Sequence, residues 1–274
     1  DDDNDGKAAI TDKYMIAQCF YAHSTQLLIN TANVLNNKED AEIYRSLLQK
    51  IKGAFVKEYL TPNSRLVSSS QTAYVLALNF DMLPENVRQS AAERLVANIK
   101  DYNYHLTTGF LGTPYLCHVL TRFGYHDVAY TLLTQETYPS WLYPVKMGAT
   151  TIWERWDGQK PDGSFQTVGM NSFNHYAYGA IGDWMYRVLA GIDTDMESDG
   201  VGYKKIIIRP RVDGKILKAG ENASEWTKVG SLQKNEKDSG GLQSVAADLQ
   251  TNYGKVSSHW KNENGLLSLE VEIP

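Results

Sequence analysis

The sequence contains little cysteine, no long apolar run and no dense cluster of basic residues. Its two cysteines, Cys19 and Cys117, lie nearly a hundred residues apart in apolar, helix-like stretches. This spacing is a poor basis for a disulfide framework and predicts buried free thiols. No run of about 18 apolar residues predicts a transmembrane helix, and no signal-peptide pattern is visible. The net charge of −5 without a Lys/Arg cluster argues against nucleic acid or an anionic membrane as the main partner, so a neutral glycan fits better.

The composition of the 274 residues is that of a globular protein, with 42% hydrophobic and 22% charged residues. It allows one large domain, or a domain and a half, with a sizeable core. The chain starts at Asp1 without a Met, which leaves open an upstream signal or domain. The segment Asp1–Gly6 also resembles the first half of a calcium loop, with Asp12 where the bidentate acid falls. A solvated acidic tail explains it as well, so we assign no metal and no cofactor.

Apolar residues at three- and four-residue spacing predict a succession of helices. Thr11 or Asp12 caps the first, and the pair Asn36-Asn37 separates it from the second. Helices that come in pairs, with unusual residues in the connecting loops, predict an α/α toroid of hairpins. The first of the seven predicted helices ends at about Leu35. The other six cover about Lys38–Leu60, Gln71–Met82, Pro84–Tyr102, Thr113–Phe123, His126–Gln135 and Phe173–Leu189.

The pattern changes to alternating apolar and polar residues at about Gly200. We predict strands at Tyr203–Pro210, Gly254–Trp260 and Leu266–Ile273, and a long loop or local disorder at Gln233–Gly241. The sequence thus predicts a mainly α chain with a β region at the C-terminus. We predict a helical domain over residues 1–199 and a β-sandwich domain over residues 200–274.

The stretch 148–158 has the composition of a sugar site. Its carboxylate, Glu154, lies between Trp153 and Trp156 and next to Arg155. Indole rings offer flat apolar platforms for the C–H face of a pyranose, and a carboxylate among them can serve as an acid or a base. The alternative is a structural ion pair between Glu154 and Arg155.

Five blocks in this order carry a family resemblance: Ser70–Tyr74, Thr108–Pro114, Tyr138–Trp141, the Glu154 stretch and Asn171–Tyr176. With them the chain resembles the α-L-rhamnosidases of glycoside hydrolase family 78, from about Tyr14 to Pro210 and more loosely to the C-terminus. The resemblance implies a partial (α/α)6 toroid followed by a jelly-roll-like β-sandwich. It implies that the first part of the barrel and further strands are missing, so the chain is a fragment or an unusual short homologue.

The family's reaction is hydrolysis with inversion, which needs an acid and a base about 6.5 to 9.5 Å apart. The match assigns the base to Glu154. The family's acid lies in a Gly-Trp-x-Gly-Asp motif upstream of the matching region, and this sequence contains no such motif. We therefore expect the isolated chain to be inactive. The resemblance implies terminal α-L-rhamnosides of plant or microbial glycans as substrates and favours a secreted or periplasmic protein, although no residue fixes the compartment.

The resemblance also places His175 against the rhamnose, where a neutral imidazole can donate one hydrogen bond and accept another. The alternative for His175 is packing inside the helix bundle. Trp141 and Trp156 are predicted to line the pocket, with core packing as the alternative for each, and Trp153 is expected in the core. Asn171 is predicted to reach a sugar hydroxyl or to cap the final helix.

Three rival functions stay open at this point. One is an α/α-toroid glycosidase with a different glycone, and another is a non-catalytic carbohydrate-binding homologue, which the missing acid motif supports. The third, a helical scaffold for protein partners, needs a large exposed apolar face. The loops rich in glycine and tryptophan favour a small-ligand site over that scaffold.

Overall fold

The computed structural model describes residues 10–196, 200–212, 241–263 and 266–274. Two compact units make up the chain, and each is described by itself. The calcium-like segment Asp1–Gly6 and most of the predicted loop Gln233–Gly241 lie outside the described residues. The first unit comprises residues 1–123 and 131–178, and the second comprises residues 124–130 and 179–274.

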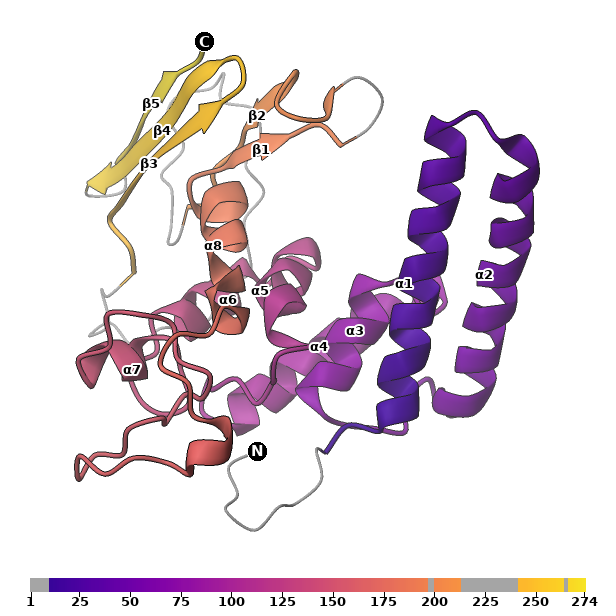
Figure 1. Ribbon diagram of the computed structural model, residues 1–274, viewed down its shortest axis with the longest axis horizontal. Helices are drawn as coiled ribbons and strands as arrows, with labels where there is room; N and C mark the ends of the chain where they lie inside the picture. Colours follow the sequence, from indigo (N-terminus) through magenta and orange to yellow (C-terminus); the bar gives the residue numbers. More distant parts are fainter. Residues whose placement is uncertain (1–9, 197–199, 213–240, 264–265) are drawn as a thin grey trace. The chain divides into compact units, whose positions relative to one another are not determined.

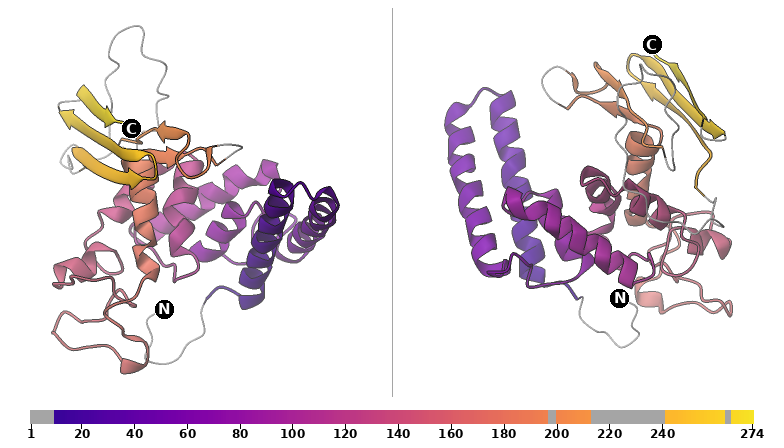
Figure 2. Two further views of the ribbon diagram at one scale, coloured as in Figure 1. Left: turned by 45° about the horizontal axis from the view of Figure 1, so that its top comes forward. Right: turned by 180° about the vertical axis from the view of Figure 1, so that it is seen from behind.

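The first unit begins with a hairpin of two long helices, α1 (Lys13–Val34) and α2 (Lys38–Tyr59), which lie side by side in Figures 1 and 2. The Asp12 carboxylate caps α1 by accepting backbone N–H groups of the first turn at 3.0 and 2.9 Å. Asn36 has a φ of 56°, which ends the helical path, and the Asn37 side chain caps α2. The predicted cap and the predicted break are therefore confirmed.

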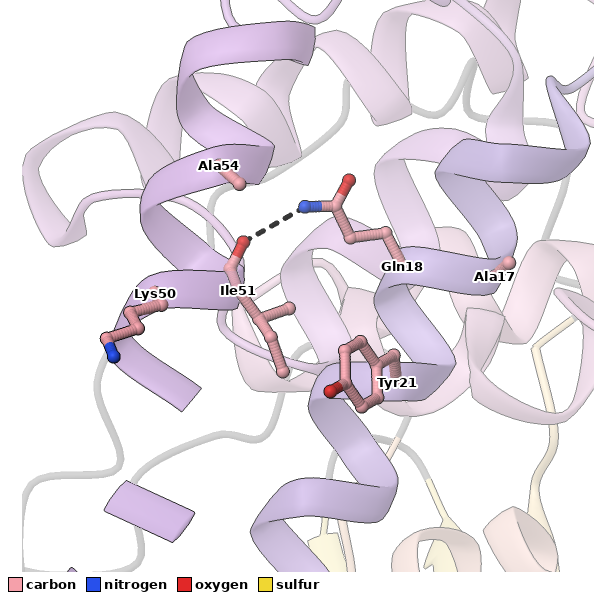
Figure 3. Close-up of a pocket in the computed structure, with 6 residues that line it drawn as sticks. All are labelled: Ala17, Gln18, Tyr21, Lys50, Ile51 and Ala54. Carbon is pink, nitrogen blue, oxygen red and sulfur yellow. Dashed lines mark hydrogen bonds between the residues drawn. The ribbon is translucent and has the colours of Figure 1, made fainter. Parts of the chain in front are cut away.

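One stripe of each helix is buried in this hairpin, because apolar residues recur every three or four positions. Gln18 of α1 also donates its Nε2–H to the carbonyl oxygen of Ile51 in α2, at 3.0 Å. Figure 3 shows this bond beside an open, mainly apolar hollow of about 550 Å³ on the surface of the hairpin. The hollow is lined by Ala17, Gln18, Tyr21, Lys50, Ile51 and Ala54.

The centre of the first unit is α3 (Gln71–Asn79), which begins after the N-cap Ser70. It packs against α1, α4 (Glu85–Asp101) and α5 (Thr113–Arg122). Because neighbours surround it, every residue from Gln71 to Leu78 is buried, rather than one stripe.

The loop before α5 is fastened to the start of α3 by the Gln71 side chain. The Gln71 amide donates to the carbonyl oxygen of His105 at 3.1 Å and accepts the backbone N–H of Thr107 at 2.8 Å. Further along the loop, a Cβ added to Gly112 would lie 2.9 Å from Oγ1 of Thr72, so only glycine fits this approach. The position of the loop is thus set by α3.

The rest of the helical region consists of short elements. Helix α6 spans His126–Leu133, and α7 spans Leu142–Lys146. The predicted seventh helix at Phe173–Leu189 is wrong at its start, because residues 172–176 are irregular and their backbone groups bond to another loop, as described below. Helical structure begins only with a 3₁₀ turn, η2 (Ala177–Ala180), then α8 (Ile181–Trp184) and a π-helical turn, η3 (Met185–Leu189).

The second unit contains two antiparallel sheets among its described residues. The smaller sheet pairs β1 (Ile192–Thr194) with β2 (Ile206–Ile208), with Asp193 opposite Ile207. In the larger sheet the order is β3-β4-β5, with Trp260 of β4 opposite both Val245 and Leu269. The bounds of these strands are Ser244–Thr251, Gly254–Glu263 and Leu266–Glu272. Strands were therefore correctly predicted in all three segments, whereas β1 and β3 were missed.

Side chains from both sheets form one hydrophobic core in the second unit. The indole of Trp260 is fully buried and donates its Nε1–H to the carbonyl oxygen of Leu189 at 2.7 Å. Gly191 has a φ of +74°, and an added Cβ would lie 2.1 Å from the nitrogen of Pro210, so only glycine fits. The core comprises Ala190, Ile192 and Val256, with Tyr203, Ile206, Ile208, Val245, Ala247 and Leu249 packed against it.

Both cysteines are free and buried, as the sequence predicts. Burial raises the pKa of the Cys19 thiol to about 12 and also raises the pKa of Cys117. None of the helices that the structure describes is long and apolar enough to cross a membrane.

Candidate active site

Two loops of the first unit meet where the sequence predicts the site. The backbone N–H of Glu154 donates to the carbonyl oxygen of Ser172, and the backbone N–H of His175 donates to that of Ile152, each at 2.8 Å. These bonds pair the two loops in opposite directions. They bring Glu154 and His175, which are 21 residues apart in the sequence, onto the same pair of loop segments.

The Glu154 carboxylate is held from one side only. The backbone N–H of Ser172 donates to its Oε2 at 2.8 Å. Among the residues that the structure describes, no donor contacts Oε1, and the side chain is only half-buried. One carboxylate oxygen is therefore oriented by the protein, and the other is available to a ligand or to water.

The Arg155 guanidinium contacts a different carboxylate. Its Nε lies 3.2 Å from Oδ1 of Asp157, and both side chains are largely buried. The other Asp157 oxygen, Oδ2, accepts from Nε2 of Gln166 at 2.5 Å. Within the described residues no ion pair joins Arg155 to Glu154. The alternative of a structural Glu154–Arg155 pair is therefore wrong, and the structural pair is Arg155–Asp157.

Trp156 is supported by other aromatic rings. Its indole stacks on Tyr178 with a centroid separation of 3.7 Å and an interplanar angle of 16°. Trp141 meets Trp156 edge to face at 5.6 Å and donates its Nε1–H to the carbonyl oxygen of Tyr178 at 3.0 Å. Trp156 is half-buried, whereas Trp141 is buried. Sugar contact by either ring stays a prediction, whereas Trp153 is buried as expected.

The Tyr178 hydroxyl is protonated at neutral pH. Burial is the largest cause and raises the pKa of Tyr178 to about 12. The positive charge of Arg155 acts in the opposite direction, and the negative charges of Asp157 and Glu154 add to the increase. The ring under Trp156 is therefore a neutral platform.

His175 lies between polar and aromatic contacts. Its ring is stacked on Phe110 with a centroid separation of 4.7 Å and an angle of 15°, and it is nearly parallel to Tyr176 at 5.1 Å. Its Nδ1 accepts the backbone N–H of Ala177 at 3.3 Å. A nitrogen that accepts carries no proton, so the neutral ring carries its proton on Nε2. His175 can therefore donate one hydrogen bond to a ligand but has no second nitrogen free to accept one.

Asn171 joins two loop segments and does not cap the final helical region, which begins only at Ala177. Its Nδ2 donates to the carbonyl oxygen of Gly158 at 3.0 Å and lies 3.4 Å from that of Gln166. A Cβ added to Gly158 would lie 2.7 Å from Oδ1 of Asn171 and 3.3 Å from the Trp153 ring. Asn171 thus holds the end of the Glu154 stretch. The predicted cap is wrong, and sugar contact by Asn171 stays a prediction.

Sequence reasoning missed Phe110, Tyr178 and Ser172 as parts of the site. Phe110 and Ser172 belong to blocks that carry the family resemblance, which is the signal that could have identified them. Their contacts join residues far apart in the chain, and no local pattern encodes such contacts. Among the described residues, no cluster of His, Cys, Asp and Glu could hold a metal ion.

Comparison with known proteins identifies the family. A model described as the bacterial alpha-L-rhamnosidase 6 hairpin glycosidase domain matches residues 1–189. A second, described as the bacterial alpha-L-rhamnosidase C-terminal domain, matches residues 191–274. The chain belongs to the bacterial α-L-rhamnosidase six-hairpin glycosidase family. The resemblance inferred from the five sequence blocks is therefore confirmed.

Relatives named alpha-L-rhamnosidase match almost the whole chain. One from Streptomyces avermitilis is 40% identical over 264 residues, which are 96% of this chain and 22% of the relative. Another, from Formosa agariphila, is 40% identical over 274 residues, which are 99% of this chain and 26% of the relative. The chain thus spans about a quarter of the length of these relatives.

Solved structures give the same result. The crystal structure of the Streptomyces avermitilis alpha-L-rhamnosidase complexed with L-rhamnose matches with a TM-score of 0.80 and 41% identity, covering 96% of this chain and 22% of that one. The native enzyme from Aspergillus terreus matches with a TM-score of 0.82 and 34% identity, covering 97% and 28%. The predicted fold class, helical hairpins of a toroid followed by a β domain, is confirmed.

Proposed function

We propose that this chain forms part of an inverting α-L-rhamnosidase in which Glu154 is the general base. The proposed substrates are terminal α-L-rhamnosides of plant or microbial glycans. Family membership supports the reaction class, and the rhamnose complex of the Streptomyces avermitilis relative supports the sugar. The observation that carries the role of Glu154 is its carboxylate geometry: Oε2 accepts the Ser172 N–H at 2.8 Å, and no donor among the described residues contacts Oε1.

In the proposed reaction, Oε1 of Glu154 accepts a proton from a water molecule as the water oxygen attacks the anomeric carbon. The bond to the leaving oxygen breaks at the opposite face of the ring, which inverts the configuration. Holding Oε2 through a backbone N–H keeps the carboxylate from rotating, so the base is pre-positioned. The second carboxyl, the acid, is not assigned to any residue of this chain.

The other site residues bind and support the sugar in this proposal. His175 donates from Nε2 to a ring hydroxyl, because its Nδ1 is occupied by the Ala177 N–H. Trp156, which is half-buried, offers its ring to the apolar side of the sugar, and Trp141 supports that indole by an edge-to-face contact. Asn171 holds the Gly158 end of the stretch in place.

The test is Glu154→Gln, which keeps the shape and removes the base. The release of p-nitrophenol from p-nitrophenyl α-L-rhamnopyranoside is measured for the 274-residue chain and for the complete product of its gene. For the complete product, we expect kcat to fall by about 10² to 10⁴-fold. Glu93→Gln, an exposed glutamate of α4, is the matched control and should keep full activity. Equal rates for Glu154→Gln and the parent would exclude Glu154 as the base.

Stereochemistry tests the inverting route separately. Proton NMR within the first minutes of turnover should show β-L-rhamnose before mutarotation produces the α anomer. If the α anomer forms first, the reaction retains configuration and a water-activating base is the wrong role for Glu154.

A non-catalytic carbohydrate-binding protein is the second candidate, because the Gly-Trp-x-Gly-Asp motif is absent from the sequence. Calorimetric binding of L-rhamnose by a complete gene product that lacks turnover would favour it. Turnover of a different p-nitrophenyl glycoside, with none of the rhamnoside, would favour a toroid glycosidase with another glycone.

A further inference from the structure

A second hollow in the first unit lies next to the candidate site, and its volume is about 280 Å³. It is formed where the N-terminal ends of α1, α3 and α5 meet the C-terminal end of α4. This hollow is separate from the one in Figure 3, which lies further along the α1–α2 hairpin and shares no lining residue with it. Its size is close to the lower limit for a small-molecule site.

Phe110 connects this hollow with the candidate site. Phe110 lines the hollow, and its ring is also stacked on His175 at 4.7 Å with an angle of 15°. The loop that carries Phe110 is fixed by Gln71, which bonds the backbone at His105 and Thr107. A ligand in the hollow would therefore lie beside a sugar that contacts His175, with Phe110 as the shared wall.

The lining of the hollow has the chemistry of a site for a neutral, hydroxyl-rich ligand. Among the described residues that line it, none is Lys, Arg, Asp or Glu. Phe110 and Leu111 supply apolar surface. Several hydroxyl groups of the lining form no hydrogen bond within the described part of the chain, and they are available to a ligand: Ser69, Thr72, Tyr102 and Thr107.

We propose that this hollow is the subsite for the sugar unit to which the rhamnose is linked. The inference rests on the proposed function, because it takes the rhamnose site to be at His175. A pyranose ring matches the lining. Its C–H faces can pack against Phe110 and Leu111, and its hydroxyls can form hydrogen bonds with the side-chain hydroxyls named above. An anionic ligand does not match, because none of the described residues that line the hollow carries a positive charge.

Calorimetry with two ligands tests the subsite. The complete product of the gene carrying Glu154→Gln, which slows turnover by the 10² to 10⁴-fold expected above, is titrated with methyl α-L-rhamnoside and with the rhamnosyl-glucose disaccharide rutinose. We expect rutinose to bind more tightly. The Ser69→Phe substitution introduces a ring at an exposed position on the rim of the hollow. It should raise the Kd for rutinose by about tenfold, equivalent to about 1.4 kcal/mol, and leave the Kd for methyl α-L-rhamnoside unchanged.

Thr107→Val is a more conservative variant, because it keeps the side-chain shape and removes one hydroxyl of the lining. The backbone N–H of residue 107 still bonds to Gln71 in this variant. Loss of one hydrogen bond should raise the Kd for rutinose by about fivefold. The matched control is Thr31→Val, at an exposed position of α1 that does not line the hollow, and it should change neither Kd.

The outcomes separate the two proposals. If methyl α-L-rhamnoside binds and rutinose binds no more tightly, the subsite is wrong and the proposed function stands. If Ser69→Phe weakens both ligands equally, the hollow holds the rhamnose itself and the subsite is again wrong. If neither ligand binds, the proposed function and the subsite both fail.

Discussion

Helix α3 and the loop segment 148–178 belong to the same compact unit but are held by different forces. In α3 the residues Gln71–Leu78 are all buried, and regular backbone bonds and apolar contacts hold the helix. In the loops, the geometry depends on single contacts, such as the Ser172 N–H on Glu154 and the Asn171 amide on the carbonyl oxygen of Gly158. The stability of α3 therefore depends chiefly on burial, whereas the positions of the site residues depend on a few polar groups.

The largest predicted effect is on the helical side of this comparison. Leu78 is fully buried in α3, so Leu78→Ala leaves a cavity and should lower the free energy of unfolding by about 3 to 4 kcal/mol. Leu27 of α1 is 51% exposed, and Leu27→Ala should change it by less than about 0.5 kcal/mol. Urea unfolding followed by circular dichroism measures both. Similar losses for the two variants would contradict the central position of α3.

Alkaline pH should lower the free energy of unfolding through the ionisation of Tyr178. The pKa of Tyr178 is raised from 10.0 to about 12 in the folded chain. Below pH 10 the hydroxyl is protonated in both states, and its full contribution to stability is present. As the pH rises through about 12 that contribution is lost, because the unfolded chain ionises first, and two pKa units correspond to about 2 to 3 kcal/mol.

Tyr178→Phe keeps the ring under Trp156 and removes the ionisable group. The variant should therefore lose less stability than the parent between pH 9 and pH 12, in urea unfolding series at each pH. Measurements at pH 7 give the effect of losing the hydroxyl itself and serve as the reference. Parallel curves for parent and variant over the alkaline range would show that Tyr178 does not control this loss.

A smaller effect is expected at Gly158, where the loops are held by one close approach. In Gly158→Ala the new methyl group would lie 2.7 Å from Oδ1 of Asn171, so that side chain must move. We expect a loss of about 1 to 3 kcal/mol and weaker binding of methyl α-L-rhamnoside in calorimetry. A Cβ on Gly169 would meet nothing within 4 Å, so Gly169→Ala is the matched control. If both variants bind like the parent, the Gly158–Asn171 contact does not position the site.

The two regions also differ in how well the sequence predicts them. The helices follow from the spacing of apolar residues and from local caps such as Asp12 and Asn37, because both signals lie within a few residues. The helix expected from Phe173 failed at its start, because the backbone groups of Ser172 and His175 bond to the Glu154 loop instead of to a helical turn. Local spacing does not encode that competition.

The site shows the same limit. Glu154 and His175 could be named from sequence blocks, yet their contacts could not be predicted, since Phe110 lies 65 residues before His175 in the chain. The strand β1 has only three residues, which is too short for an alternating pattern to be recognised. The predicted boundary between helical and β domains at residue 200 stays a prediction.

The two hydrogen bonds of the buried Gln71 amide have a consequence for how the loop before α5 tolerates length changes. The side-chain amide bonds the backbone as a neighbouring strand would, because it donates to the carbonyl oxygen of residue 105 and accepts the N–H of residue 107. Only two residues then separate this fixed point from Phe110. An insertion after Thr107 would therefore move the Phe110 ring away from His175. The length of the short stretch between the Gln71 contact and Phe110 is thus fixed by the position of the ring.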